Sequence, residues 1–143
     1  MLMPELNTPP SCLDASCIIS LLLGSPDDHA EATRRLLQRR AASKDKLLLF
    51  TSSVLDAAVI LEEEHLVPRS MVATTLLALV QHSGVRVESP DLIRTTLAVA
   101  NAHDVPFRAA FIAVQMQQAE CTMLYATTQD YKGIAGIRCH PPD

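Results

Sequence analysis

The sequence predicts an α/β domain in which a mostly parallel sheet of four or five strands is flanked by helices. Short apolar runs of strand length alternate along the chain with longer segments of helical periodicity. Because a helix separates most strands from the next, the connections are crossovers, which join parallel strands. With 143 residues, 48% of them hydrophobic, the chain is long enough for one domain with a sizeable core.

The first half of the chain supplies two of the expected strands and three of the helices. Residues 1–10 are rich in proline and are expected to be irregular, ahead of a single domain that spans 11–143. Gly24-Ser25-Pro26 ends the first helix, and Thr51-Ser52-Ser53 can cap the third. The expected elements are a strand over Ser11–Asp14, a helix over Ser16–Leu23, a helix from Asp27 or Asp28 to Arg40, a strand over Lys46–Phe50 and a helix over Val54–Glu64.

The second half continues the alternation of helices and strands. Pro68 and Ser70 open a helix, and the run Val85–Glu88 alternates between apolar and polar residues as a half-buried strand does. Pro90 suits the first turn of the next helix. The remaining expected elements are a helix from Ser89-Pro90-Asp91 to His103, a helix over Phe107–Ala119, and strands over Thr122–Tyr125 and Ile137–Cys139.

Composition narrows the classes of function. The formal net charge of −4 argues against a protein that holds nucleic acid through its overall charge, and four glycines leave no glycine-rich phosphate loop. No apolar run is long enough to cross a membrane, and Met1–Glu5 lacks the features of a signal peptide, so we expect a cytoplasmic protein. The cysteines show no metal-binding spacing and are expected to be buried free thiols; they are Cys12, Cys17, Cys121 and Cys139.

Asp14 is the most informative single residue, because it is a lone carboxylate in an apolar run. A buried, unpaired carboxylate is costly, so Asp14 is expected at the open end of a strand, where ligands bind in α/β sheets. The alternative, which we favour from this segment alone, is that Asp14 or Ser16 caps the following helix.

Five segments, taken in order, resemble the PIN-domain family, and in particular the small VapC-like toxins of toxin–antitoxin pairs. The resemblance runs from about Cys12 to Pro141 and implies a three-layer PIN-like fold. The segments are Leu13-Asp14-Ala15-Ser16, the helix from Ser53 to Glu62, Val85-Arg86-Val87 with Pro90-Asp91-Leu92, the helix start from Phe107 to Ala113, and the run from Leu124 to Tyr131.

The resemblance implies an Mg²⁺- or Mn²⁺-dependent endoribonuclease whose metal is held by three or four carboxylates. Asp14 matches the first acid, and Asp56 falls where the second belongs. The third position is Ala109 and the fourth is Thr128, so two of the acids are replaced. Aspartates introduced at positions 109 and 128 are therefore expected to join Asp14 and Asp56 and to strengthen metal binding.

Two other acids are candidates to substitute for the missing ones. A two-residue shift of the match would place Asp130 at the fourth position, although Asp130 also suits an ordinary turn. Asp104 precedes the Ala109 helix, but it does not share the expected face. The sequence thus favours a PIN-like protein with weakened or lost RNA cleavage that acts by binding RNA or a protein partner; the alternative is an active endoribonuclease toxin.

The charged and apolar positions of the chain predict which partners it binds. Four arginines on one predicted helix are either candidate RNA contacts or, as we favour, a solvated face; they are Arg34, Arg35, Arg39 and Arg40. A homodimer is expected through apolar positions of the fourth and fifth helices, namely Val72, Leu76, Leu79, Ile93 and Leu97. An antitoxin is the other expected protein partner, and no membrane association is expected.

Overall fold

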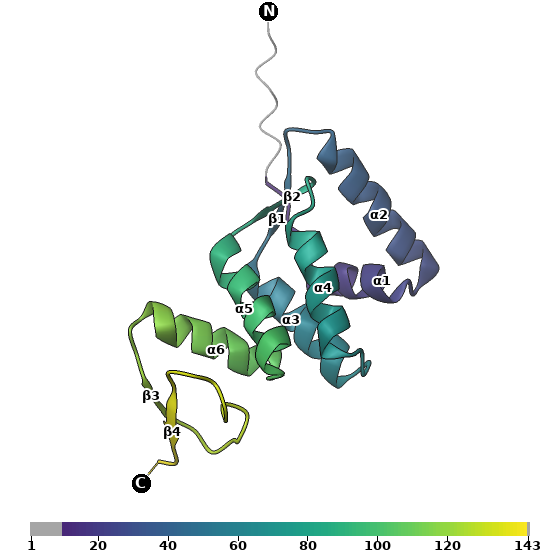
Figure 1. Ribbon diagram of the computed structural model, residues 1–143. Coiled ribbons are helices and arrows are strands. Elements are labelled where there is room, and N and C mark those ends of the chain that lie inside the picture. Colours follow the sequence, from purple (N-terminus) through teal and green to yellow (C-terminus); the bar gives the residue numbers. More distant parts are fainter. Residues whose placement is uncertain (1–9, 143) are drawn as a thin grey trace, which may run out of the picture.

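The computed structural model describes residues 10–142, and most of the predicted irregular segment 1–10 lies outside the described residues. The described chain is mixed α/β, with six helices and four strands of three residues each (Figure 1). The helices are α1 Ala15–Leu23, α2 Asp27–Ala41, α3 Thr51–Glu63, α4 Arg69–Val80, α5 Pro90–His103 and α6 Phe107–Gln118. The strands are β1 Leu47–Leu49, β2 Val85–Val87, β3 Met123–Tyr125 and β4 Arg138–His140.

One small parallel sheet lies within the helical body. β1 pairs with β2 in parallel, with Leu48 opposite Arg86. Residues 11–13, here called the edge segment, run parallel to β1 on its other side through a single bridge between Cys12 and Leu48. Because α2 and α4 both contact β2, helices cover this sheet, as is usual for parallel strands.

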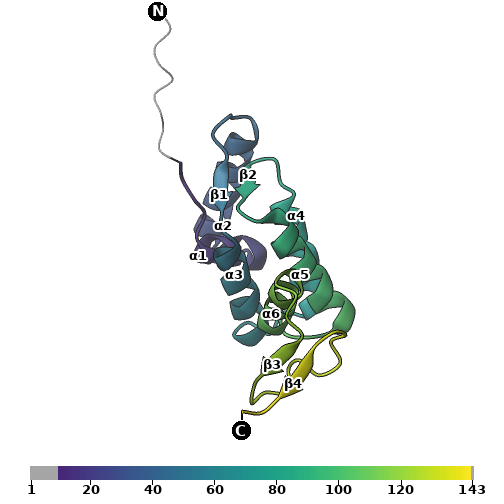
Figure 2. The same cartoon turned by 90° about the vertical axis from the view of Figure 1, so that its left-hand side faces the viewer.

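The second parallel pair, β3 with β4, stands apart from the first. In Figures 1 and 2 this pair lies at the opposite end of the molecule from β1 and β2. The predicted sheet of four or five strands is therefore not seen, and the described residues form two sheets of two strands each. The reason is the direction of α6, which begins in the body and carries the following chain away from β1 and β2 (Figure 1).

The core is built from leucine, valine, isoleucine and alanine, with Phe107 as its largest fully buried side chain. The apolar positions of α4 and α5 that were expected to form a dimer surface belong to this core; Val72, Leu76, Leu79, Ile93 and Leu97 are all at most 5% exposed. That expectation is wrong for these residues, because α4 and α5 pack their apolar faces against each other and against α3.

Two further features of the fold are the exposure of the cysteines and the length of the helices. All four cysteines are free, but Cys12, Cys121 and Cys139 are exposed and Cys17 is half-buried, so the expected burial is wrong. Among residues 10–142, no helix combines the length and apolarity needed to cross a membrane.

Candidate functional site

Asp14 and Asp56 line one open cleft, with a volume of ≈ 370 Å³. The cleft lies where the edge segment and β1 end, because Asp14 directly follows the edge segment and α3 begins two residues after β1. Its other lining residues are Ala15, Ser52, Ser53, Leu55, Val59 and Arg108. The carboxyl ends of parallel strands thus bring two acidic side chains together, as they do in other α/β ligand sites.

Asp14 is the N-cap of α1. Its backbone is extended, and its Oδ2 accepts hydrogen bonds from the Ser16 N–H at 2.9 Å and from the Ser16 hydroxyl at 2.6 Å. These bonds, the hydroxyl bond first, lower the pKa of Asp14 because they stabilise the charged carboxylate. Asp14 is exposed, so it pays no large burial cost and stays open to a ligand while it caps the helix.

The first turns of α3 supply the rest of the cleft floor. Asp56 is exposed and lies four residues after Ser52, so both side chains share one face of the helix. No side chain caps α3; instead, the Thr51 N–H donates to Glu88 Oε1 at 3.3 Å. Glu88 follows β2, so its side chain fixes the start of α3 at this edge of the sheet, although it does not line the cleft. Sequence reasoning overlooked Glu88, although its place after an alternating run was the available signal.

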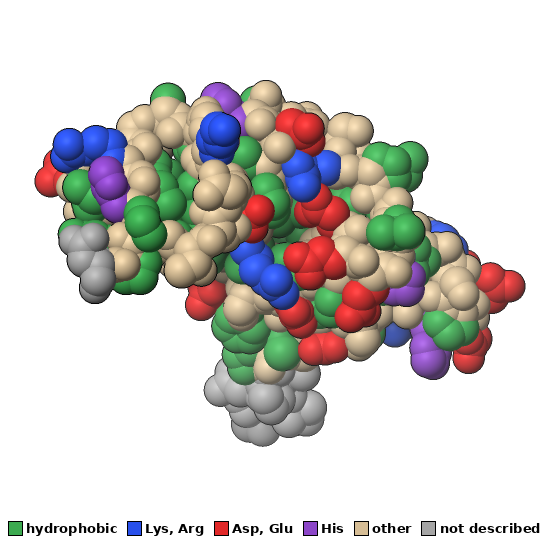
Figure 3. Space-filling view, turned by 90° about the horizontal axis from the view of Figure 1, so that it is seen from below, with side chains coloured by type: hydrophobic (Ala, Val, Ile, Leu, Met, Phe, Trp, Pro, Cys, Tyr) green, Lys and Arg blue, Asp and Glu red, His purple; other side chains and the backbone are tan. Residues whose placement is uncertain are grey.

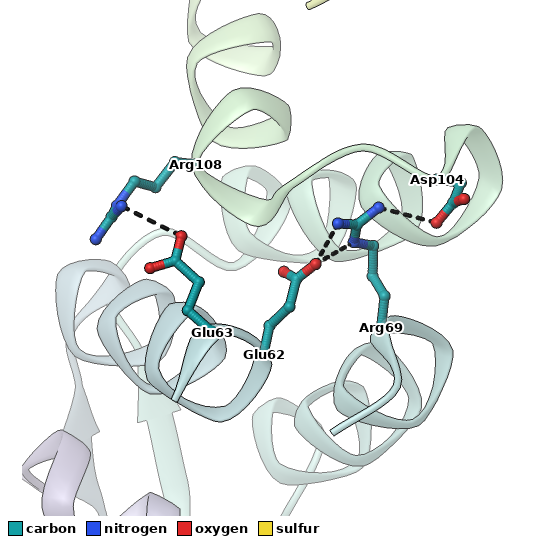
Figure 4. A network of polar contacts seen from close by, with 5 residues as sticks. All are labelled: Glu62, Glu63, Arg69, Asp104 and Arg108. Carbon is teal, nitrogen blue, oxygen red and sulfur yellow. Dashed lines mark hydrogen bonds and ion pairs between the residues drawn. The ribbon is translucent and has the colours of Figure 1, made fainter. Parts of the chain in front are cut away.

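Arg108 is the basic residue of the cleft, and sequence reasoning missed it. It comes from the first turn of α6, and its Nη1 lies 3.4 Å from Glu63 Oε1 on α3. A second pairing lies beside it, in which Arg69 contacts Glu62 and also Asp104, the latter at 2.8 Å (Figure 4). These ion pairs connect α3 with α4 and with the start of α6, and Arg108 lines the cleft together with the two aspartates.

The structure does not bring the other sequence-predicted acid positions to the cleft. Ala109 is 2% exposed and packs in the interior, so an aspartate there would be a buried charge instead of a ligand. Thr128 and Asp130 lie after β3, where the Asp130 N–H donates to the Thr128 hydroxyl at 3.2 Å. Asp104 ends α5 in a left-handed conformation and binds Arg69.

Neither position 109 nor position 128 lines the cleft of Asp14 and Asp56, so the effect of aspartates there stays a prediction. Ala109 is buried near the start of α6, and position 128 follows β3, which lies at the opposite end of the molecule from β1 and β2 (Figure 1).

The donor set of the cleft does not fit a two-metal centre. Among the described residues, no group of three or more histidine, cysteine, aspartate or glutamate side chains is placed to hold a metal ion. Mg²⁺ requires six oxygen ligands in near-octahedral geometry, and two metals share several carboxylates. Here Asp14 Oδ2 already accepts two hydrogen bonds, and the positive charge of Arg108 lines the same cleft.

Arg40, in the last turn of α2, lies at the other edge of the body sheet. Arg40 donates to the Ser11 hydroxyl and the Asp45 carbonyl, at 3.0 and 3.1 Å, where the edge segment and β1 begin. Arg34 pairs with Glu31 within the helix, while Arg35 and Arg39 are exposed. Two of the four arginines thus have contacts within the chain, and none lines the Asp14 cleft.

No protein-family model matches the chain, and no curated protein matches it.

Proposed function

We propose that the chain is a PIN-like protein, related to VapC-like toxin ribonucleases, that has lost efficient metal-dependent RNA cleavage and acts by binding a protein partner. The observation that carries this proposal is the composition of the cleft: two exposed carboxylates, no third acid and one arginine. Such a site lacks the ligands for two-metal chemistry but retains a strong local charge pattern.

Charge favours a basic protein segment over RNA as the occupant of the cleft. Asp14 and Asp56 repel a phosphate backbone, whereas a lysine or arginine side chain from a partner would pair with them. Seen from below, acidic side chains gather across the middle of the molecule, with basic ones among them (Figure 3). An antitoxin that presents a basic segment is the kind of partner that this surface suits.

RNA cleavage provides the first test. RNA is incubated with Mn²⁺ and the natural protein, with Asp14→Asn, and with the control Asp91→Asn, which removes an exposed carboxylate from the first turn of α5. We expect the same negligible degradation from all three proteins. Cleavage by the natural protein and by Asp91→Asn, lost in Asp14→Asn, would show an active endoribonuclease and overturn the proposal.

Peptide binding provides the second test. The probe is a fluorescent peptide that carries two arginines, and its binding is followed by anisotropy at low and high salt. We expect the double variant Asp14→Asn, Asp56→Asn to weaken binding several-fold at low salt, because it removes both charges of the cleft. Asp91→Asn should bind as the natural protein does. Equal binding by all three proteins would contradict a basic partner at this cleft.

A further inference from the structure

The β3–β4 pair is an unusual parallel sheet, because helices leave much of it open. All three residues of β4 are exposed, and Tyr125 of β3 is 66% exposed. Parallel strands are almost always buried on both faces, and an isolated pair of strands is marginal in water. The sequence of β3, Met-Leu-Tyr, is also apolar and uncharged, which makes its open side suited to pairing with another strand.

The edge segment also has an open side. The Leu48 N–H donates to the Ser11 carbonyl at 2.8 Å, and the Leu13 N–H donates to the Leu48 carbonyl at 3.1 Å. Since alternate residues of a strand direct their backbone groups to opposite sides, the N–H and carbonyl of Cys12 face away from β1. Within residues 10–142, no backbone hydrogen bond reaches either group.

The hydrogen bonds of β3 define which of its residues face outward. The Arg138 N–H donates to the Thr122 carbonyl at 2.8 Å, and the Ala126 N–H donates to the His140 carbonyl at 2.9 Å. Residues 122, 124 and 126 therefore face β4, and Met123 and Tyr125 direct their backbone groups to the open side. On that side the Met123 carbonyl receives the Cys121 thiol, a weak donor, at 3.5 Å.

These two open sides match in one parallel register. In a parallel pair, the residue just before the one opposite Cys12 accepts a hydrogen bond from the Cys12 N–H. The residue just after it donates its N–H to the Cys12 carbonyl. Met123 and Tyr125 provide this carbonyl and this N–H, which places Leu124 opposite Cys12. The pairing would make one parallel sheet from the edge segment, β1, β2, β3 and β4.

The two sides do not meet within one copy of the chain. Phe107 and Ala110 fix the start of α6 in the core, and the helix then extends for 12 residues, about 18 Å, before β3. In Figures 1 and 2, β3 lies beyond α6, at the far end from β1. In a second copy of the chain, β3 can reach the edge segment of the first copy without any change in the direction of α6.

We propose that two copies of this chain form a closed dimer in which β3 of each copy pairs in parallel with the edge segment of the other. Reciprocal exchange uses both open sides of both copies, as two-fold symmetric pairing requires. Because the strands run parallel, the loop after β3, with Thr128 and Asp130, would reach the edge where Asp14 lies in the other copy. A second copy would then bring Asp130 to the edge of the cleft, as a third acid that the cleft of a single copy lacks. The strand pairing itself does not depend on the function proposed above.

A cysteine crosslink tests both the pairing and its register. The protein carries Leu124→Cys together with Cys17→Ser, Cys121→Ala and Cys139→Ser, so that Cys12 and position 124 hold the only thiols. Opposite residues of neighbouring strands lie within the Cα separation that a disulfide spans. Mild oxidation with copper phenanthroline at high micromolar protein should give a covalent dimer on a non-reducing gel. The control, which also carries Cys12→Ser, should give much less.

Each other outcome of the crosslink overturns the proposal. A disulfide within one monomer would show that the two sides meet in the same chain. A dimer in sedimentation without the Cys12-dependent crosslink would place the dimer interface elsewhere. A protein that sediments as a monomer and gives no crosslink would show that the dimer does not form.

A proline substitution tests the same pairing in a chain with its natural cysteines. Tyr125→Pro removes the N–H that would donate to Cys12 of the second copy, and that N–H faces away from β4. We expect Tyr125→Pro to sediment as a monomer at a concentration at which the natural protein is a dimer, whereas Tyr125→Ala stays dimeric. Dimers of equal stability from both variants would contradict the pairing.

Discussion

The helical body and the β3–β4 region use the same local structure, but the burial of their strands differs at the extremes. Each contains two parallel strands of three residues, yet Leu47 and Leu49 of β1 are at most 2% exposed while every residue of β4 is exposed. β2 and β3 lie between these extremes, each with two half-buried residues and one exposed residue. α2 and α4 contact β2, whereas α6 leads away from the body sheet before β3 begins (Figure 1). The comparison shows that helix cover and strand sequence act together, because the buried strand is Leu-Leu-Leu and the open strand is Arg-Cys-His.

The largest contrast in stability should come from removing one aromatic side chain from each region. Phe107→Ala empties a fully buried site of the body and should lower the free energy of unfolding by about 3–5 kcal/mol. Tyr125→Ala removes a mostly exposed side chain and should cost less than about 1 kcal/mol when measured in dilute protein. Urea denaturation of both variants checks this, and comparable losses would remove the distinction between the regions.

Introduced carboxylates should sharpen the same contrast. Ala109→Asp places an unpaired carboxylate in the interior and should lower the free energy of unfolding by about 3 kcal/mol or more. Thr128→Asp adds the same group at an exposed position near β3 and should change it by less than about 0.5 kcal/mol. Metal titration of each variant is the accompanying measurement. Tight Mn²⁺ binding by a stable Ala109→Asp protein would show that position 109 faces the cleft after all.

Ion pairs within the body should differ according to their exposure. The Arg69 and Glu62 side chains are 22% and 18% exposed, so Arg69→Ala should cost about 1–2 kcal/mol. Arg108 and Glu63 are 66% and 57% exposed, and Arg108→Ala should cost less than about 0.5 kcal/mol. A double-mutant cycle for each pair measures the coupling, and equal couplings would contradict the ranking.

The smallest effect concerns the cap of α1 and its dependence on pH. The folded-state pKa of Asp14 is lowered, so its charge stabilises the fold above the unfolded pKa, and this contribution is lost as pH falls through the folded pKa. Asp14→Asn keeps a capping side chain without the charge. Its denaturation midpoint should lie slightly below that of the natural protein at neutral pH. The difference should begin to shrink as pH falls below the unfolded pKa of about 3.9 and should vanish once pH is below the folded pKa. A constant difference across this range would assign the effect to packing.

The sequence was sufficient to predict the helices of both regions. All six are present, because their apolar spacing and their glycine and proline boundaries are local signals. Pro90 opens α5 and Gly24 ends α1, as the pattern predicted. The cap of α1 was also predictable, since Asp14 followed by Ser16 offers the required oxygen at the required position.

The site and the sheet were only partly predictable from sequence. The resemblance to the PIN family placed Asp14 and Asp56 at one site, and both line one cleft, but the burial of Ala109 depends on how α6 packs against its neighbours. Arg108 could not be found because its role comes from a contact between α3 and α6, 45 residues apart in sequence. The separation of β3 from β1 likewise depends on the direction of α6, for which the sequence contains no local signal.

Hydrogen exchange, measured by region at two protein concentrations, tests the central claim that the body is a closed unit and that β3–β4 is open until a second copy covers it. In dilute protein, amides of β1 and β2 should exchange slowly, while the Tyr125 amide, which faces away from β4, should exchange rapidly. At high concentration, the amides of Tyr125 and Cys12 should become protected together, because each would donate a hydrogen bond across the dimer. Slow exchange of the Tyr125 amide in dilute, monomeric protein would contradict the account.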